Sequence, residues 1–357
     1  MKKNIALLFG GISGEYEVTL KSVTSIFNHI DKNKYDVSLI GITRDGEWIY
    51  CGKDIESVTN DTWMNVHGTE EYKVEVNMVP QRNKKVGIYF KDGTVTTIDA
   101  IFPVLHGPYG EDGKIQGLLE ISQIPYVGCG VLASSVGMDK LICKKVFTQA
   151  EIPQVEYSYT TMFQFDLEKE SELDRIENTL KYPIFVKPAN MGSSVGISKV
   201  KNREELEAGI IEALKYDTRI VLEEGRNVRE IEVAVLGNDV VKASIAGEVI
   251  PAKEFYDFND KYIDGASVTQ IPANISEDLM TEIRENAIKA FKAIDGTGLS
   301  RVDFFIDKDT NEVFINEINT LPGFTNISMY PQMWGATGIE YSELIDKLIE
   351  LAEDRKK

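Results

Sequence analysis

The chain has 357 residues, of which 43% are hydrophobic, and it carries a formal net charge of -18 at pH 7. A chain of this length divides into two or three domains, because single hydrophobic cores stop growing near roughly 250 residues. The acidic balance argues against nucleic-acid partners, which need lysine and arginine concentrated on one face.

The cysteines and the longest apolar runs indicate the compartment. Cys51, Cys129 and Cys143 form no C-x-x-C pair, which fits neither a disulfide framework nor a thiolate zinc site. No stretch approaches the roughly eighteen apolar residues of a membrane span. We therefore expect reduced thiols, a soluble cytoplasmic protein and no membrane partner.

The N-terminal third alternates short apolar runs with helical stretches. Residues 5–9 are too short a run for a secretory signal and predict a buried first strand, and residues 18–30 follow helical spacing. Further strand-like runs are YDVSLIGIT, AIFPVLHG and IPYVGCG, with the helical stretch KIQGLLEIS before the last. This pattern predicts a parallel α/β domain that ends near residue 128.

The segment GCGVLA at residues 128–133 matches the G-x-G-x-x-A fingerprint of dinucleotide-binding folds, with Glu151 as the candidate ribose acid. A tight turn explains the same residues. Because so short a pattern commonly arises by accident, we prefer the turn to a nicotinamide site.

The central part has the pattern of a small α+β unit that ends near Glu223. A helix over MDKLICKKVFTQ carries Lys140, Lys144 and Lys145, and the strand-like runs KYPIFVKP and VGISKV enclose a glycine-rich loop. REELEAGIIEALKY predicts an amphipathic helix and RIVLEE another strand.

That glycine-rich loop allows two chemistries. Gly192, Ser194 and Gly196 satisfy the G-x-S-x-G nucleophile elbow, but the elbow needs a helix after its serine, whereas ISKV has the pattern of a strand. All three histidines also precede Ser194, so a serine hydrolase is the less favoured reading. A turn between two strands instead offers backbone N–H groups and the hydroxyls of Ser193 and Ser194 to a phosphate, with charge from Lys187. A plain hairpin would explain the loop if it stood alone.

The C-terminal part contains a second candidate site. SRVDFFID and VFINEIN are separated by the turn-like KDTN and predict a hairpin, in which alternation pairs Arg301 with Asp303 and Glu317 with Asn319 on one face of each strand. Asp303, Glu317 and Asn319 offer the oxygen ligands that Mg²⁺ prefers. A solvent-facing hairpin is the alternative. The isoleucines beside Glu317 and Asn319 favour an interior metal site.

The remaining C-terminal elements follow from the same patterns. EIEVAVLG and VVKASIAGEVI predict strands, residues 277–294 predict a helix, and IEYSELIDKLIELAED predicts a closing helix. The sequence contains no internal repeat and no low-complexity tract. The pattern as a whole predicts a mixture of α/β and α+β structure.

Taken in order, these motifs resemble the D-alanine–D-alanine ligases of the ATP-grasp superfamily. The matching segments are LLFGGISGEYEVTL, FPVLHGPYGEDGKIQGLLE, YVGCGVLASSVGMDK, FVKPANMGSSVGISKV, REIEVAVLG, EFYDFNDKY, SRVDFF and INEINTLPGFT. Residues 51–95 match nothing in this pattern. The resemblance implies a three-domain ATP-grasp architecture with an N-terminal parallel-sheet domain. Its parts are the N-terminal α/β domain (residues 1–128), the central lid domain (129–222) and the C-terminal domain with the metal and acceptor site (223–357).

The resemblance also implies the reaction. ATP phosphorylates the carboxylate of one D-alanine, and the amine of a second attacks the resulting acyl phosphate to give D-alanyl-D-alanine for peptidoglycan synthesis. Carboxylates do not react with amines until the oxygen becomes a good leaving group, which explains the need for ATP. Two Mg²⁺ ions, for which Mn²⁺ can substitute, and a homodimer are implied as well.

Residue roles are carried over from the matching motifs. The nucleotide residues are Lys140, Lys187, Ser194, Glu223, Glu224 and Glu230, with Glu223 and Glu224 at the adenine end. The metal ligands are Asp303, Glu317 and Asn319. Lys187 and the glycine-rich loop would neutralise charge on the transferring phosphoryl group.

The first-substrate residues implied are Glu15, which binds the ammonium group, and His106, with Arg301 stabilising the oxyanion. Lys261 and Tyr262 belong to the segment EFYDFNDKY, which resembles a loop that closes on the site and joins Tyr262, Ser193 and Glu15 by hydrogen bonds. Each has a plainer reading. Glu15 suits the first turn of a helix, His106 suits a structural histidine, and an aromatic loop can simply pack on the surface.

The acceptor site is implied by Ser328, which matches the residue that holds the acceptor carboxylate, and by the apolar Met329. The Lys261–Tyr262 pair argues for an amine acceptor over D-lactate, while NIS at residues 326–328 departs from the family pattern. We expect D-alanine as acceptor and keep D-serine as the alternative. A non-catalytic nucleotide-binding module is disfavoured because Arg301, Lys261 and the metal ligands are all retained.

Overall fold

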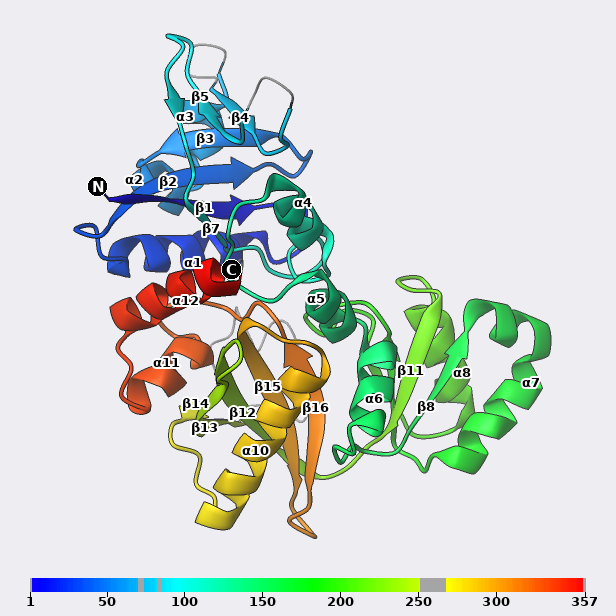
Figure 1. The fold of residues 1–357 in the computed structure, drawn as a ribbon. Helices are drawn as coiled ribbons and strands as arrows, with labels where there is room; N and C mark the ends of the chain where they lie inside the picture. The colour runs from blue at the N-terminus through cyan, green and yellow to red at the C-terminus, as the bar shows by residue number, and fades with distance from the viewer. Residues whose placement is uncertain (1, 70–73, 82–84, 251–267, 356–357) are drawn as a thin grey trace.

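Four β-sheets organise the described residues (Figure 1), and the small β4-β5-β6 sheet is inserted in the sequence between β3 and β7 of the N-terminal sheet. The computed structural model describes residues 2–69, 74–81, 85–250 and 268–355. The helices are α1 (Tyr16–His29), α2 (Ile55–Thr59), α3 (Trp63–His67), α4 (Lys114–Ser122), α5 (Val131–Met138), α6 (Lys140–Gln149), α7 (Met162–Thr179), α8 (Arg203–Ala213), α10 (Glu277–Ala293), α11 (Met329–Ala336) and α12 (Tyr341–Arg355). The strands are β1 (Lys3–Gly10), β2 (Tyr35–Ile42), β3 (Trp48–Gly52), β4 (Glu75–Asn77), β5 (Gly87–Tyr89), β6 (Val95–Thr96), β7 (Ala100–Pro103), β8 (Tyr157–Thr161), β9 (Ile184–Pro188), β10 (Ser198–Val200), β11 (Arg219–Glu224), β12 (Val228–Gly237), β13 (Lys242–Ile250), β14 (Val268–Gln270), β15 (Gly298–Asp307) and β16 (Val313–Asn319).

The N-terminal sheet has the order β3-β2-β1-β7, with β1 parallel to both β2 and β7. Residues 5–9 of β1 are completely buried because both faces of the sheet are covered. Ile5 and Leu7 pack into a core that includes α1 and α12, whereas Ala6 and Leu8 pack with α4 and the small β4-β5-β6 sheet. The predicted parallel domain is confirmed, except that β3 joins as an antiparallel edge strand and the run at residues 124–130 forms only a single bridge at Tyr126.

Part of the segment that matched no motif builds a cover for this sheet. Trp63 of α3 is fully buried, its ring stacks edge-on against Phe9 at 5.1 Å, and its indole N–H donates to the Tyr16 hydroxyl at 3.0 Å. The ring lies directly on Gly41 of β2, where any side chain would collide with it. This segment therefore contributes to the N-terminal core.

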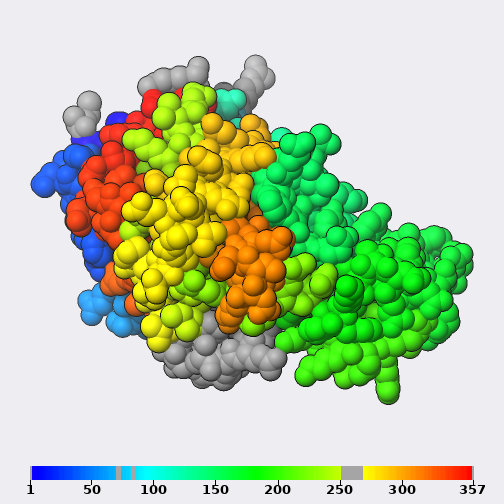
Figure 2. Space-filling model, turned by 90° about the horizontal axis from the view of Figure 1, so that it is seen from below, coloured from blue at the N-terminus to red at the C-terminus, as the bar shows by residue number. Residues whose placement is uncertain are grey.

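The central sheet, β10-β9-β11-β8, is antiparallel throughout and forms a lobe that projects from the rest of the molecule (Figures 1 and 2). One face packs on α7 and α8 through a core that includes Ile184, Val186, Ile220 and Leu222. Because side chains alternate along a strand, Lys187 of β9 and residues 221 and 223 of β11 lie on the other face, against α6.

The C-terminal sheet, β14-β13-β12-β15-β16, is also antiparallel, and α10 covers one face (Figure 1). The predicted hairpin is confirmed, with Arg301 opposite Asn319 and Asp303 opposite Glu317. Val302 and its alternate neighbours point into the α10 core. The polar side chains of β15 and β16 consequently lie on the sheet face that α10 leaves uncovered.

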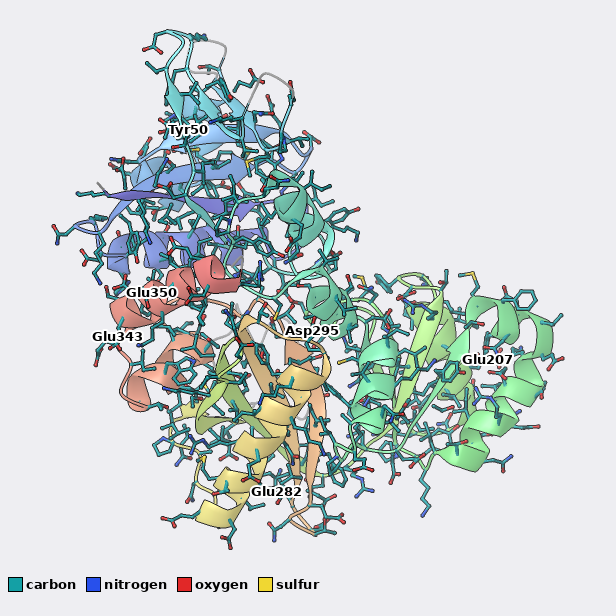
Figure 3. All side chains as sticks on the ribbon, viewed as in Figure 1. Tyr50, Glu207, Glu282, Asp295, Glu343 and Glu350 are labelled. Atoms are coloured by element: carbon teal, nitrogen blue, oxygen red, sulfur yellow. The ribbon has the colours of Figure 1, made fainter. Side chains whose placement is uncertain are left out.

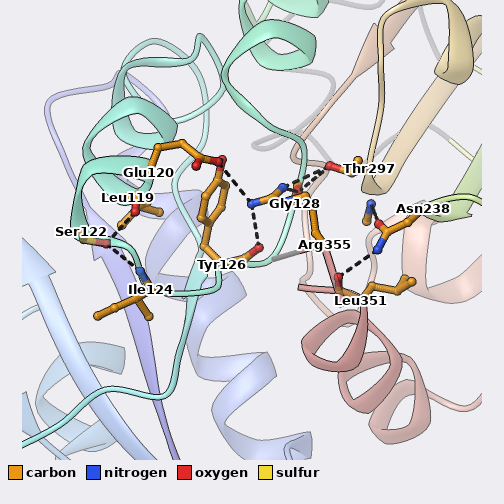
Figure 4. A network of polar contacts seen from close by, with 11 residues as sticks. Leu119, Glu120, Ser122, Ile124, Tyr126, Gly128, Asn238, Thr297, Leu351 and Arg355 are labelled. Carbon is orange, nitrogen blue, oxygen red and sulfur yellow. Dashed lines mark hydrogen bonds and ion pairs between the residues drawn. The ribbon is translucent and has the colours of Figure 1, made fainter. Parts of the chain in front are cut away.

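Helix α12 returns to the N-terminal sheet and packs beside α1 (Figure 1). Its last described residue, Arg355, donates to the Gly128 carbonyl oxygen at 2.6 Å and to the Thr297 hydroxyl at 3.1 Å, and its guanidinium lies 3.9 Å from the centre of the Tyr126 ring (Figure 4). These contacts join the last helix to the connection between the N-terminal and central parts. The predicted domain boundaries stay predictions, and the one at 222/223 falls inside β11.

The acidic composition is visible on the surface helices. Acidic side chains such as Glu282 on α10 and Glu343 and Glu350 on α12 lie on the outer sides of their helices (Figure 3). The three cysteines are buried and free. Each helix in the described ranges is too short or too polar to cross a bilayer.

Candidate functional site

A cavity of about 990 Å³ lies where the three parts of the chain meet. Its walls come from α1, the loop after β9, the uncovered faces of β12, β15 and β16, and the start of α11. The predicted site residues that line it are Glu15, His106, Lys140, Ser193, Arg301, Glu317, Asn319, Ser328 and Met329. Residues from 15 to 329 are thus brought to one site by the fold.

Glu15 and Ser193 meet across this cavity. The Ser193 hydroxyl donates to Glu15 Oε1, which joins the start of α1 to the loop after β9. Glu15 was predicted to lie in the first turn of α1. It occupies the N-cap position, one residue before the helix begins, and its side chain makes no capping hydrogen bond. The Glu15–Ser193 hydrogen bond is therefore confirmed. The predicted third member, Tyr262, and Lys261 lie outside the described residues.

The segment HGPYGEDG forms the wall beside Glu15. His106 is buried and its Nε2 lies 3.1 Å from the Ser22 hydroxyl of α1. Burial lowers the pKa of His106, against the opposing effect of the Glu15 charge, so the imidazole is neutral at pH 7. Gly107 has a positive φ of +72°, and a side chain there would overlap Glu15 Oε2. The glycine therefore lets the carboxylate approach the backbone closely.

Glu111 is a second carboxyl group in this wall. It accepts a hydrogen bond from the Gly107 N–H at 2.9 Å, and its Oε1 lies 3.8 Å from His106 Nδ1. Burial, with the nearby charge of Glu15, raises the pKa of Glu111 to about 8. At pH 7 the group is therefore mostly protonated, although sequence reasoning assigned it no role.

The β15–β16 hairpin supplies the charged floor. Arg301 donates to both oxygens of Asp303, at 2.7 and 2.6 Å, and lies 3.2 Å from a Glu232 oxygen. Burial opposes its charge, but Asp303 and Glu232 raise the pKa of Arg301 well above its usual value, so the guanidinium stays charged. Glu232 also lines the cavity and was not predicted, although its alternation with Glu230 in EIEVAVLG placed it on the same face.

The predicted metal ligands fit a hard cation by their donor atoms. Asp303 and Glu317 lie opposite each other on paired strands, and Asn319 follows two residues later on the same face. Asn319 Oδ1 accepts from the Leu321 N–H at 2.9 Å, and Asp303 is engaged by Arg301. Among the described residues no ready-made cluster of three or more His, Cys, Asp or Glu ligands occurs. Carboxylate and amide oxygens are nevertheless the set that Mg²⁺ takes when substrate phosphates complete its shell.

The glycine-rich loop is anchored at its base by α6. The backbone N–H of Lys140 donates to the Ala189 carbonyl at 2.8 Å, and the Lys140 ammonium donates to the Met191 carbonyl at 2.7 Å. Ser193 and Ser194 both adopt positive φ, +51° and +60°, a conformation that non-glycine residues rarely take in succession. Such backbone geometry is concentrated at ligand-binding loops. The segment after Ser194 is the strand β10, so the helix required by a nucleophile elbow is absent at this point of the described chain.

Behind this loop lies a buried charge cluster. Lys187 Nζ is 2.5 Å from Glu223 Oε2, and Lys144 Nζ is 2.8 Å from Glu223 Oε1. Burial alone would raise the pKa of Glu223, but Lys144 and Lys187 lower it to about 2. Sequence reasoning placed Lys187 and Glu223 near the nucleotide and missed Lys144, which sits on the apolar side of α6 between Leu141 and Phe147.

One side of the cavity, where sequence analysis predicted the acceptor, is formed by the start of α11. Ser328 is the N-cap residue of α11, and its hydroxyl accepts from the Thr325 N–H at 2.9 Å. Met329 is 7% exposed and touches β13 at Gly247. Asn326, in the segment that departs from the family pattern, accepts from the Ser25 hydroxyl at 2.8 Å.

The remaining predicted residues stand back from the cavity lining. These are Lys187, Ser194, Glu223, Glu224, Glu230 and Asp303. Glu224 closes β11, where its N–H donates to the Glu156 carbonyl at 2.9 Å, and Glu230 lies on β12 on the same side as Glu232. Lys187, on β9, is paired with Glu223, and Asp303 lies against Arg301.

Two family models match the chain. The model described as D-ala D-ala ligase N-terminus matches residues 4–129, and the model described as D-ala D-ala ligase C-terminus matches residues 146–350. A D-alanine--D-alanine ligase of Acetivibrio thermocellus is 49% identical over 99% of this chain and 96% of the relative. The corresponding protein of Clostridium acetobutylicum is also 49% identical, over 99% of each chain.

Solved structures agree with these matches. The VanG D-Ala:D-Ser ligase of Enterococcus faecalis superposes with a TM-score of 0.86 at 38% identity, covering 99% of this chain and 100% of the other. The D-alanine-D-alanine ligase of Coxiella burnetii gives a TM-score of 0.84 at 36% identity, covering 99% and 95%. With its ATP-grasp fold and a cavity built from the expected motifs, the chain belongs to the D-alanine–D-alanine ligase family.

Proposed function

We propose that this protein joins two D-alanine molecules to D-alanyl-D-alanine at the cost of ATP, for peptidoglycan precursor synthesis. The observation that carries the proposal is the single cavity in which Glu15, Ser193 and Arg301 converge from three separate parts of the chain. The family match over nearly the full length supports it.

The proposed reaction has two balanced steps. A carboxylate oxygen of the first D-alanine attacks the γ-phosphorus of ATP, and ADP leaves. The amine of the second D-alanine then attacks the acyl carbon, phosphate leaves, and the amine gives up a proton. Exclusion of water from the site would protect the acyl phosphate from hydrolysis.

Residues in the different walls of the cavity would perform different steps of this reaction. Glu15 would hold the ammonium of the first D-alanine, and the neutral His106 would contact the same substrate without adding charge. Arg301, which stays charged although buried, would stabilise the oxyanion of the tetrahedral intermediate. Ser328 would hold the carboxylate of the acceptor beside Met329.

The nucleotide would lie between the central and C-terminal sheets. Lys140, Lys187 and the backbone of the 192–196 loop would face the phosphates, with Glu223, Glu224 and Glu230 toward the base and sugar. Asp303, Glu317 and Asn319 would hold Mg²⁺, which neutralises phosphate charge when bound. We also propose that two Mg²⁺ ions are bound and that Mn²⁺ can replace them. Ser194 would bind the nucleotide, Lys261 would bind substrate, and Tyr262 would take part in catalysis.

The acceptor is the less constrained substrate. We propose D-alanine, because the apolar Met329 lies beside Ser328 where a serine side chain would seek a polar partner. The likeness to the VanG D-Ala:D-Ser ligase makes D-serine the second candidate.

The test is phosphate release from Mg²⁺ and ATP with D-alanine, L-alanine, D-serine or D-lactate, with products identified by mass. Turnover that depends on D-alanine and yields the dipeptide is expected. Unchanged ATP with every amino acid would refute the ligase assignment, and comparable kcat/KM values for D-serine as acceptor would refute the acceptor preference. The proposed homodimer and cytoplasmic location are checked separately, by light scattering and by cell fractionation.

A further inference from the structure

The buried cluster of Lys144, Lys187 and Glu223 contains one more ammonium group than the carboxylate can balance. The three side chains come from α6, β9 and β11, and one lysine ammonium lies within ion-pair distance of each Glu223 oxygen. Burying a charge costs free energy unless it is paired, so a second lysine in this position needs a reason beyond pairing Glu223.

The two lysines are not equivalent. The Lys144 side chain is 3% exposed and Glu223 is 4% exposed, whereas Lys187 is 11% exposed. Lys144 is enclosed by the α6 core and the Tyr157 ring, whose centre is 5.2 Å from its ammonium. Lys187 is the more exposed of the two lysines, and it also interacts electrostatically with Glu317, which lines the cavity, and with Glu230. Lys187 therefore has charged neighbours other than Glu223 on the side toward the cavity-lining Glu317.

We propose that Lys144 is a positioning residue: its ammonium stays on Glu223 as the permanent counter-ion and so frees Lys187 to turn toward the nucleotide phosphates. The inference rests on the proposed function, because it assumes that this face of the cavity binds ATP. Without Lys144, Glu223 and Lys187 form an exclusive buried pair. Lys187 can then reach a phosphate only by leaving an unpaired carboxylate behind.

The test measures binding of the non-hydrolysable analogue AMP-PNP with Mg²⁺ by calorimetry, so that it does not depend on turnover. Lys144→Met is expected to raise the Kd about tenfold or more, the scale seen when a buried charge pair is perturbed. Lys145→Met, at an exposed lysine on the same helix, is the matched control and should leave the Kd within about twofold. Lys144→Arg, which keeps the positive charge, is expected to bind more tightly than Lys144→Met.

A double-mutant cycle separates positioning from a structural role. In a Glu223→Gln background the negative charge that holds the Lys187 ammonium is removed. Lys144→Met should then change the Kd by less than about threefold. An equal loss in both backgrounds, or an unchanged Kd in Lys144→Met alone, overturns the inference. If Lys144→Met does not fold, as judged by circular dichroism, Lys144→Gln takes its place. A wild-type chain that binds AMP-PNP but fails to ligate D-alanine would refute the proposed function and leave this inference standing.

Discussion

The raised pKa of Glu111 predicts a specific dependence of stability on pH. In the folded chain this carboxyl is buried beside Glu15, and its pKa is raised to about 8, whereas an ordinary glutamate ionises near 4.5. Between these values the folded state holds a proton that the unfolded state releases. Stability contributed by Glu111 is therefore fully present below about pH 4.5 and is lost as the pH rises toward 8.

The magnitude follows from linkage. One proton bound only in the folded state changes the free energy of unfolding by about 1.4 kcal/mol per pH unit. Between pH 5.5 and 7.5 the stabilisation contributed by Glu111 should thus fall by about 2.5 kcal/mol, because the folded carboxyl begins to ionise near the upper end of the interval. The variant Glu111→Gln keeps the acceptor oxygen for the Gly107 N–H and cannot ionise. Its free energy of unfolding should therefore rise relative to that of the wild type by this amount over the same interval.

The assay is urea unfolding of both proteins at half-unit steps from pH 5 to pH 8, with the difference in unfolding free energy plotted against pH. Glu282→Gln, at an exposed carboxylate on α10, removes a charge without touching the buried cluster and serves as the control. A difference between Glu111→Gln and wild type that stays flat, or that falls with pH, would refute the reasoning.

Other substitutions test the remaining contacts. Gly107→Ala forces a side chain against Glu15 at a positive φ. The KM for the first D-alanine, measured by initial rates, should rise, and the free energy of urea unfolding should fall by about 1–2 kcal/mol. An unchanged KM would contradict this. Trp63→Ala removes a fully buried indole and should cost about 3–5 kcal/mol in urea unfolding, and a loss below 1 kcal/mol would show that the cover packs loosely. Arg355→Ala should lower the unfolding free energy by about 1–2 kcal/mol, because the charged hydrogen bond to the Gly128 carbonyl is lost, and an unaltered thermal transition would argue against that contact.

Local patterns predicted the features that depend on neighbouring residues. Alternation along β15 and β16 placed Arg301, Asp303, Glu317 and Asn319 on common faces, and the observed register agrees. The helices α1, α4, α8, α10 and α12 followed from apolar spacing. Ser193 and Glu15 are 178 residues apart, so their hydrogen bond came from the family resemblance and not from any local signal.

The features that were missed depend on tertiary packing. Lys144 belongs to a helix with three lysines, and a charge run on a helix usually faces solvent, so its burial against β11 was not visible in the sequence. Helix α7 is polar along most of its length, with a break at Glu168, and gave no clear periodicity. Trp63 could not be assigned to the core, because its partners lie on strands β1 and β2, far away in sequence.

The proposed roles place the carboxylate of Glu15 in two binding sites at once. It lies against Gly107 in the cavity wall proposed to bind the amino acid, and it accepts a hydrogen bond from the hydroxyl of Ser193 in the loop proposed to hold phosphate. Any ligand that repositions this one group changes the free energy of both sites. By thermodynamic reciprocity, occupancy of the ammonium site must then alter nucleotide affinity by the same factor with which the nucleotide alters affinity for the amino acid.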